Sequence, residues 1–449
     1  MIYNSLKVLV KLTTYAYFKR IKIDGIGNIP QKGPYIFVAN HPSAFMDPVV
    51  IAGAIKPALY FIAAGEYVGK GLKGWIFKKM LHMIPVYRPD TRPGETFKNN
   101  EMFEHCYTHL NKQGALLIFP EGVSVTDRIL KPLKTGVIRI ARGAELKNLG
   151  SQPIPIVPIG LNYSNPHEFR SDLLMKIGEP YFINKVFKRE DITEKEKVVQ
   201  ATNELEKLMQ DTLIHTVNDE VDAMWKKLDL TFLRDLKQEQ DIKFYDQLKE
   251  FELKQFFVSA IQYFRDHNLS KYNEASAKLE SYLLNLDRAG LNDKNIAEFN
   301  REMNYKKILS FALGLPFFLL GAIFNFIPYN TVIFLSRKIK MNTTFKGSIA
   351  LAIGLFTFLG WYIALTIIIG YLYFSWFAII CPILFYATGI YSLMYLAAIR
   401  HSASRNNLRK LFSKNSASVK NLLFERKELI ELLKASKEEF EQANTNQLL

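Results

Sequence analysis

The stretch from residue 21 to residue 187 alternates short apolar runs with segments of helical periodicity. The apolar runs predict strands at 35–39, 58–63, 84–87, 115–119, 154–161 and 174–178. Between them, the pattern predicts helices at 47–55, 70–82, 96–112 and 134–147. This alternation is typical of an α/β sandwich with a largely parallel, mixed sheet. In such sheets, ligands bind beyond the carboxyl ends of the strands.

Residues 1–20 have the pattern of an amphipathic helix. One side carries Ile2, Leu6, Leu9, Val10, Ala16 and Tyr17, and the other carries Asn4, Lys7, Lys11 and Thr14. Basic residues follow at 19, 20 and 22, so the helix can lie on an anionic membrane surface. Packing on its own domain is an equally open alternative. The lysines inside the apolar run do not fit a cleaved signal peptide.

Two polar helical segments are predicted further along the chain. Residues 188–305 are rich in Leu, Lys, Glu and Gln and predict a helical extension, for which a packing role is the default. Residues 401–449 predict a charged helical tail. Its apolar residues fall roughly in heptad register, which Arg426 interrupts: Leu422, Leu429, Leu433 and Phe440. Too few heptads remain to predict a coiled coil.

Residues 306–400 predict a membrane region. No charged residue occurs from 308 to 335, or again from 347 to 399. About 20 apolar residues are needed to cross a bilayer as a helix. The second run is therefore long enough for a hairpin of two helices, with a turn near 370–375. The first run, interrupted by Pro316 and Pro328, is either a re-entrant hairpin bent near 325–330 or a single span.

Basic residues on the flanks of both runs favour one of these alternatives. Arg301, Lys306 and Lys307 precede the first run, Arg337, Lys338, Lys340 and Lys346 separate the runs, and Arg400, Arg405, Arg409 and Lys410 follow the second. Such residues prefer the cytoplasmic side. All three flanks can lie on the cytoplasmic side only if each apolar run crosses the membrane an even number of times or returns to the side from which it entered. We therefore expect an integral membrane protein with a re-entrant first run and its soluble domain on the cytoplasmic face.

Composition adds a preference for anionic partners. The 449 residues carry a net charge of +15, which suits anionic lipid, phosphorylated substrates or nucleic acid. Nucleic acid is not expected, because the basic residues gather at the membrane flanks and near one predicted loop. Cys106 and Cys381 are the only cysteines, so neither a disulfide framework nor a zinc site is expected.

The first predicted strand of the series, 35–39, ends at a histidine. Asn40 and His41 follow it directly, and Asp47 lies six residues after the histidine. A carboxylate can fix the tautomer of a histidine base and stabilise its imidazolium, so the pair is a candidate for acid–base catalysis. A polar strand end with Asp47 as a turn residue before Pro48 is the structural alternative.

Three more segments with polar or proline residues lie at the end of a predicted strand, just after one, or inside one. Met83-Ile-Pro-Val-Tyr-Arg88 ends in an arginine, which binds phosphate with a fixed pair of donors. Phe119-Pro-Glu-Gly122 places a carboxylate and a glycine just after a strand, and Arg128, Lys131 and Lys134 follow in the same loop. Val157-Pro158 lies inside an apolar strand. Each motif by itself is more often structural than functional.

In this order and spacing, the four segments resemble the sequence blocks of the phospholipid/glycerol acyltransferase superfamily, also called lysophospholipid acyltransferases. Asn40-His41, Arg88, Phe119-Pro-Glu-Gly122 and Val157-Pro158 match block by block over residues 20–185. The stretch from Pro120 to Gly136 resembles the branch that contains fungal glycerol-3-phosphate acyltransferases. Five residues separate His41 from Asp47, where four are usual in the family, and the longer spacing also occurs in that branch.

The resemblance implies an acyltransferase of phospholipid biosynthesis. His41 would be the general base and Asp47 its orienting partner. Arg88, Glu121, Gly122, Ser124 and Lys134 would bind the phosphoglycerol acceptor, and Val157 and Pro158 would line the acyl side. The donor would be acyl-CoA or acyl-carrier protein, with no further cofactor and no metal. The acceptor, glycerol-3-phosphate or 1-acylglycerol-3-phosphate, stays open. A catalytically inactive relative that binds lipid or acts as a scaffold is the alternative.

Overall fold

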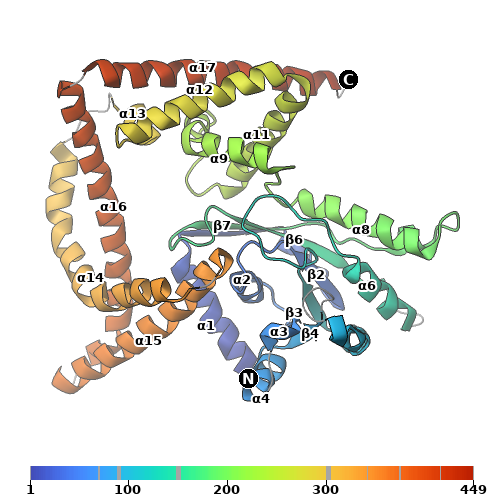
Figure 1. The fold of residues 1–449 in the computed structure, drawn as a ribbon. Helices are drawn as coiled ribbons and strands as arrows, with labels where there is room; N and C mark the ends of the chain where they lie inside the picture. The colour runs from blue at the N-terminus through green and yellow to red at the C-terminus, as the bar shows by residue number, and fades with distance from the viewer. Residues whose placement is uncertain are drawn as a thin grey trace. The chain divides into compact units, whose positions relative to one another are not determined.

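The structure is a computed structural model that describes residues 2–68, 71–87, 93–147, 153–299, 305–340, 342–373, 376–414 and 416–447. The chain divides into two compact units. Unit 1 comprises Met1–Val217, Phe244–Gln255 and Met341–Leu351. Unit 2 comprises Asn218–Lys243, Phe256–Lys340 and Ala352–Leu449. Figure 1 shows the ribbon with the labels used below.

Unit 1 is built on a mixed sheet, to which the described residues contribute seven strands in the order β1-β7-β6-β2-β5-β3-β4. The strands are β1 (Arg20–Asp24), β2 (Tyr35–Ala39), β3 (Leu59–Ala64), β4 (Met83–Val86), β5 (Ala115–Ile118), β6 (Ile156–Tyr163) and β7 (Asp172–Ile177). Pairing is parallel except between β6 and β7. The predicted α/β fold with a largely parallel, mixed sheet is confirmed.

Helices cover both faces of this sheet (Figure 1). The unit contains α1 (Ile2–Tyr17), α2 (Met46–Ala54), α3 (Gly65–Val68), α4 (Gly71–Trp75), α5 (Asn99–Asn111), α6 (Gly136–Lys147), α7 (Asn184–Phe187) and α8 (Glu194–Gln210). Short helices of other types lie at Ile26–Asn28, Ile76–Met80, Pro93–Lys98 and Thr343–Phe345. Ile36 and Val38 of β2 pack with α5, α6 and α8, whereas Phe37 and Ala39 pack with α2. Successive side chains of a strand alternate between faces, so β2 is buried on both.

The position of β2 at the centre of the sheet determines where the candidate residues meet. It pairs with β5 on one side and with β6 on the other, parallel to both. Val38 lies in register with Ile118 of β5 and with Pro158 of β6. The carboxyl ends of β2 and β5 therefore lie side by side, which brings the residues after Ala39 close to those after Ile118.

Some boundaries differ from the sequence-based prediction. The sequence pattern does not predict strand β1; its five residues at 20–24 alternate charged and apolar side chains and pair at the sheet edge with β7. Helix α8 was assigned to the extension after residue 187, yet its apolar face completes a core of unit 1. The capping box of Thr193 and Glu196 starts this helix. Residues 244–255 and 341–351 also belong to unit 1.

Helix α1 is packed along one side and apolar on the opposite side. Tyr17 and Phe18 at its end lie in the core that contains β2 and α2. Lys7, predicted for the polar side, donates hydrogen bonds to backbone carbonyls at the end of α2, Ile55 and Lys56. Val8 and Leu12 are exposed at 60% and 64%. Packing on the domain is therefore present, and an interfacial role for the exposed stripe stays a prediction.

Unit 2 is helical in its described part. Its helices are α9 (Asp219–Thr231), α10 (Leu233–Glu239), α12 (Leu269–Arg288), α13 (Asp293–Ala297), α14 (Tyr305–Lys338), α16 (Cys381–Lys414) and α17 (Ser416–Gln447), with a short helix at Trp376–Ile379. Helix α11 (Gln247–His267) starts in unit 1 and continues into unit 2, as does α15 (Lys346–Tyr373).

The charged tail is helix α17, which lies beside α12 (Figure 1). Val419, Leu422, Leu429, Leu433 and Phe440 are buried along it. Arg426 occupies the heptad position between two of these leucines, where the sequence suggested an interruption. Its Nε donates to Asp293 at 2.7 Å, and its guanidinium also pairs with Asp235.

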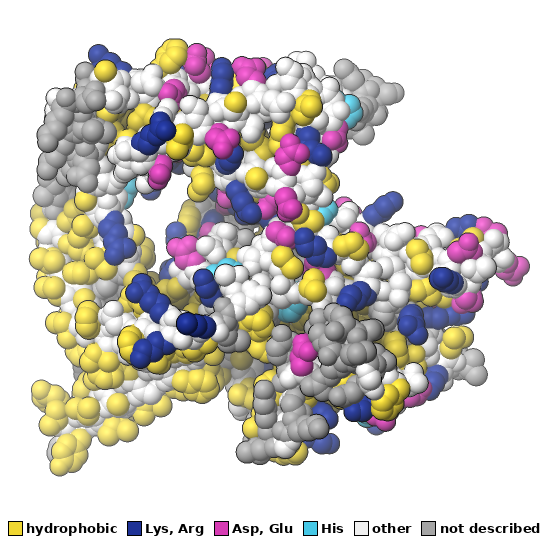
Figure 2. All heavy atoms as spheres, viewed as in Figure 1, with side chains coloured by type: hydrophobic (Ala, Val, Ile, Leu, Met, Phe, Trp, Pro, Cys, Tyr) yellow, Lys and Arg dark blue, Asp and Glu magenta, His cyan; other side chains and the backbone are white. Residues whose placement is uncertain are grey.

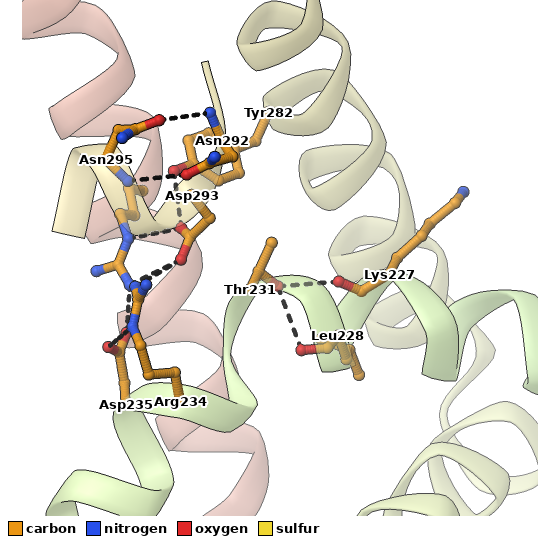
Figure 3. A network of polar contacts seen from close by, with 10 residues as sticks. Lys227, Leu228, Thr231, Arg234, Asp235, Tyr282, Asn292, Asp293 and Asn295 are labelled. Atoms are coloured by element: carbon orange, nitrogen blue, oxygen red, sulfur yellow. Dashed lines mark hydrogen bonds and ion pairs between the residues drawn. The ribbon is translucent and has the colours of Figure 1, made fainter. Parts of the chain in front are cut away.

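Asp293 is the centre of this polar cluster and is 4% exposed. Figure 3 shows its carboxylate facing Tyr282 and Arg234. Tyr282 Oη donates at 2.9 Å and Arg234 Nη2 at 2.7 Å, in addition to Arg426. A buried charge is tolerated only when it is paired and hydrogen-bonded. The cluster thereby fastens α17 to α10, α12 and α13.

The described residues contain three helices long and apolar enough to cross a membrane: Leu309–Lys338, Thr343–Tyr373 and Cys381–Ser404. Apolar side chains dominate the surface of these helices in Figure 2. The two-helix arrangement expected over 347–399 is present as α15 and α16. The re-entrant hairpin over 308–335 is wrong as secondary structure, because α14 is one continuous helix containing Pro316 and Pro328. Figure 1 shows it bending along its length, as prolines cause without ending a helix. The sidedness of the flanks stays a prediction.

Polar side chains and glycines join the apolar helices within unit 2. Asn325 Nδ2 of α14 donates to Phe385 O of α16 at 2.9 Å, and its Oδ1 accepts from Tyr362 Oη of α15 at 2.6 Å. A Cβ at Gly321 would lie 2.0 Å from Thr388 O, so the backbones of α14 and α16 touch there. Small residues at close crossings and polar bonds between helices are the usual basis of packing in membranes.

We expect Arg426→Ala to lower the thermal stability of unit 2. The change leaves Asp293 with two of its three described donors, and hydrogen bonds to charged groups contribute about 1.5–3 kcal/mol. Thermal unfolding of the purified protein should show an earlier transition. The matched control is Lys427→Ala, whose side chain is 74% exposed and pairs with its own helix. Equal transitions for the two variants would contradict the role of the cluster.

Candidate active site

His41 and Asp47 meet at the carboxyl end of β2. His41 Nδ1 lies 2.8 Å from Asp47 Oδ2, within hydrogen-bond distance. Asp47 stands in the first turn of α2, and the loop between the strand and this helix folds so that the side chains face each other. The spacing of five intervening residues therefore does not prevent the contact. With Nδ1 bonded to the carboxylate, Nε2 is the ring nitrogen left for a substrate proton.

The Asp47 carboxylate is completely buried and receives further hydrogen bonds. Its side chain is 0% exposed, against 20% for His41. Ser43 N–H donates to Oδ2 at 2.8 Å, and Tyr163 Oη donates to Oδ1 at 2.9 Å. Burial and the neighbouring carboxylate raise the pKa of Tyr163 well above its ordinary value, so the phenol keeps its proton and stays a donor. These donors allow a charged carboxylate to exist in the core.

The His41 ring is oriented by a second contact. It stacks on the ring of Phe119, with the centroids 4.0 Å apart and the planes inclined by 18°. Phe119 directly follows β5, and the parallel pairing of β2 with β5 places it beside the histidine. The ring is thus held at its edge by Asp47 and on its face by Phe119. A base fixed in this way is pre-organised for proton transfer.

Glu121 contacts backbone groups on two loops. Its Oε1 accepts from His41 N–H at 3.0 Å and its Oε2 from Lys131 N–H at 2.9 Å. Burial raises the pKa of this carboxyl, while the two N–H donors oppose the shift. Glu121 therefore connects the loop after β2 to the loop after β5. A direct contact with an acceptor stays a prediction.

Ser124, Gly122 and Lys134 lie in the same loop after β5. Ser124 Oγ accepts from Ala44 N–H at 3.0 Å, where Ala44 has an unusual positive φ of 39°. Gly122 has a φ of 70°, and a Cβ there would lie 2.8 Å from Lys134 Nζ. Glycine thus permits both the turn and the close lysine. Lys134 is exposed and remains a candidate for binding an anionic acceptor.

Arg88, Val157 and Pro158 are the other residues predicted for the site. Arg88 lies outside the described residues. Val157 is 0% exposed in the core that contains β2, and Pro158 is buried in the adjacent position of β6. That Val157 and Pro158 line the acyl side of the site stays a prediction. Asn40 extends the pairing of β2 with β6: its side chain exchanges two hydrogen bonds with the backbone of Leu161, at 2.7 and 3.1 Å.

Sequence reasoning missed Tyr163 as a member of the site. It ends β6, the neighbour of β2, so its position could have been found by the rule that carboxyl ends of parallel strands converge. Phe119 belongs to the predicted motif Phe119-Pro-Glu-Gly122, but the sequence does not indicate that its ring stacks on His41. Ser348, which contacts the loop after β2 from a segment distant in sequence, carries no signal of this kind.

Comparison with known proteins identifies the domain. The Acyltransferase family model matches residues 20–162. Two Saccharomyces cerevisiae relatives are named Glycerol-3-phosphate O-acyltransferase 1 and 2. The first is 24% identical over 269 aligned positions, covering 40% of this chain and 35% of that protein. The second is 36% identical over 90 aligned positions, covering 20% and 12%. The matches thus span about a third or less of these relatives.

A third relative is bacterial. It is the Mycoplasma pneumoniae protein named "Probable 1-acyl-sn-glycerol-3-phosphate acyltransferase", 28% identical over 171 aligned positions, covering 36% of this chain and 57% of that protein. The matched region contains His41 after β2, Asp47 in α2 and Glu121 after β5. The chain therefore contains, over residues 20–162, an acyltransferase domain of the phospholipid/glycerol acyltransferase superfamily.

Proposed function

We propose that this protein transfers a fatty acyl group from an acyl thioester to a hydroxyl of a phosphoglycerol acceptor at a membrane. The observation that carries the proposal is the hydrogen bond between His41 and the buried Asp47 at the carboxyl end of β2. A histidine whose Nδ1 is held by a carboxylate is suited to accept a proton at Nε2. The donor is acyl-CoA or acyl-carrier protein, and phospholipid synthesis is the process served.

In the proposed reaction, His41 Nε2 takes the proton from the acceptor hydroxyl as its oxygen attacks the thioester carbonyl. Asp47 stabilises the imidazolium that forms, since a carboxylate with three described donors remains an acceptor for Nδ1–H. A C–O bond forms, the C–S bond breaks, and the departing thiolate receives the proton from His41. No acyl-enzyme is required, so the reaction needs no nucleophilic serine or cysteine.

The acceptor is proposed from charge and from the relatives. Lys131 and Lys134 lie in the loop after β5, where Gly122 allows Lys134 to lie against the backbone and Lys131 pairs with Asp127 at 2.9 Å. Cationic side chains at this place suit the phosphate of a phosphoglycerol. The names of the relatives include both glycerol-3-phosphate and 1-acylglycerol-3-phosphate as acceptors. We propose this acceptor class, and a direct comparison of the two compounds decides between its members.

The membrane setting is proposed from α14, α15 and α16, each of which meets the length and composition of a span. A long-chain acyl donor and its lipid product are both delivered and released most easily at a bilayer. If all three helices span, the basic residues between α14 and α15 and those after α16 share one side, which favours the cytoplasmic face for the segment 341–351 of unit 1.

We expect His41→Ala to reduce acyl transfer about 10²–10⁴-fold, the usual contribution of a general base. The assay uses the full chain in detergent or bilayer discs. Each acceptor is tested in turn with labelled palmitoyl-CoA and with palmitoyl-carrier protein. The control is His105→Ala, an exposed histidine on α5. Wild-type rates for His41→Ala would contradict the mechanism. Binding of an acceptor by the wild-type protein without turnover would instead support a non-catalytic lipid-binding protein.

We expect Tyr163→Phe to lower kcat about tenfold, because hydrogen bonds to charged groups contribute about 1.5–3 kcal/mol and this one holds the partner of the base. KM for both substrates should stay close to the wild-type value. Steady-state kinetics measure both constants. Tyr181→Phe is the matched control, since its hydroxyl also donates to a carboxylate, Glu204, at 2.9 Å. The same loss of kcat in both variants would contradict the assignment.

A further inference from the structure

The loop between β2 and α2 has its backbone N–H groups bonded to side chains from several segments. His41 N–H donates to Glu121, Ser43 N–H to Asp47, and Ala44 N–H to Ser124. A fourth bond joins this segment to a different part of the chain. Met46 N–H donates to Ser348 Oγ at 2.9 Å, across 302 positions of sequence. Ser348 belongs to the segment 341–351 that is part of unit 1.

The hydroxyl of Ser348 joins Ser43, in the loop after β2, to Met46 at the start of α2. Ser348 Oγ accepts from Met46 N–H and donates to Ser43 O at 3.1 Å. Met46 N–H also donates to Ser43 O, at 2.8 Å. The hydroxyl therefore completes a small ring of hydrogen bonds at the point where the loop becomes helix α2. Ser348 is 8% exposed, so water competes little for these bonds.

This hydroxyl adds an acceptor at a helix start that has no side-chain cap of its own. Helix α2 begins at Met46, and the residue at its N-cap position is Phe45, whose hydrocarbon side chain cannot accept a hydrogen bond. The first N–H groups of a helix need acceptors from outside the helix. Asp47 in the first turn already bonds to His41 and Ser43. Met46 N–H is shared between Ser43 O of the loop and Ser348 Oγ, which comes from another segment.

The surroundings hold Ser348 in place. A Cβ at Gly347 would lie 2.2 Å from Pro166 O, so this backbone reaches the catalytic unit only as glycine. The ring of Phe345 lies 5.6 Å from that of Phe45. Leu351 is buried in the same core as Phe37 and Val157. The first turn of α15 is thus packed into unit 1 over several contacts, and the serine is not an isolated neighbour.

We propose that Ser348 is a positioning residue for acyl transfer, which sets the relative placement of His41 and Asp47 through the loop between them. The inference rests on the proposed function of that pair. Ser348 stands at the start of α15, and the helix from Thr343 to Tyr373 is a candidate span. The loop that carries the base is consequently fastened to a membrane helix of the same chain.

The test is a double-mutant cycle of Ser348→Ala with His41→Ala in the full-length protein. In the wild-type background, Ser348→Ala should lower kcat about 10–100-fold with KM little changed, as small misplacements of catalytic groups do. In the His41→Ala background, the same change should lower the residual rate no further, because the residue acts through the histidine. An equal loss in both backgrounds would show a general structural defect and overturn the proposal.

The control on the same helix is Thr366→Ala. Thr366 Oγ1 donates to Tyr362 O of α15 at 2.7 Å, and we expect wild-type kcat. Where Ser348→Ala does not fold, Ser348→Cys keeps the shape of the side chain and weakens the hydrogen bonds. The double-mutant cycle of Ser348→Cys with His41→Ala then tests whether residue 348 acts through the histidine. Wild-type kcat for a folded Ser348 variant would overturn this inference alone. Turnover that is unaffected by His41→Ala would overturn the proposed mechanism and the inference together.

Discussion

The arrangement of unit 1 around His41 depends on one buried carboxylate. Asp47 is fully enclosed and remains a useful partner for His41 because Ser43 N–H and Tyr163 Oη share its charge with the imidazole. An uncompensated buried charge would cost several kcal/mol and would be lost by protonation. Tyr163 ends β6 and His41 follows β2, so the carboxylate joins two adjacent strands to α2. The proposed acid–base pair is therefore part of the packing between these two strands and α2.

Around this carboxylate, the loop is held by groups that do not need to touch a substrate. Glu121 and Ser124 come from the loop after β5 and Ser348 from the start of α15, and each binds a backbone N–H of the loop. Short loops between a strand and a helix contain more donors than their own residues can satisfy. Here the donors are satisfied from three directions. This restricts the loop to one conformation, including the positive φ of Ala44.

In unit 2, too, a buried charged group is satisfied by partners from several segments of the chain. Arg426 occupies a heptad position that is otherwise filled by buried leucines of α17. Its guanidinium pairs there with Asp293 and Asp235. A buried ion pair contributes less to stability than an apolar contact of similar size, but it tolerates few alternative registers. The cluster in Figure 3 thus specifies how α17 lies against the other helices of the unit. Asn325 plays a comparable part among α14, α15 and α16.

Much of this protein follows from local sequence. Alternating apolar runs indicated six of the seven described strands, and the convergence of parallel strand ends placed His41 beside Glu121. Uncharged runs indicated the three helices that are long and apolar enough to cross a membrane, because a bilayer excludes charge over a known length. The tertiary structure alone decided where α8 packs, that α14 passes its prolines without breaking, and that Tyr163 and Ser348 meet Asp47 and the loop between β2 and α2. Such contacts join positions with no shared period or motif, so they arise only when packing brings distant segments together.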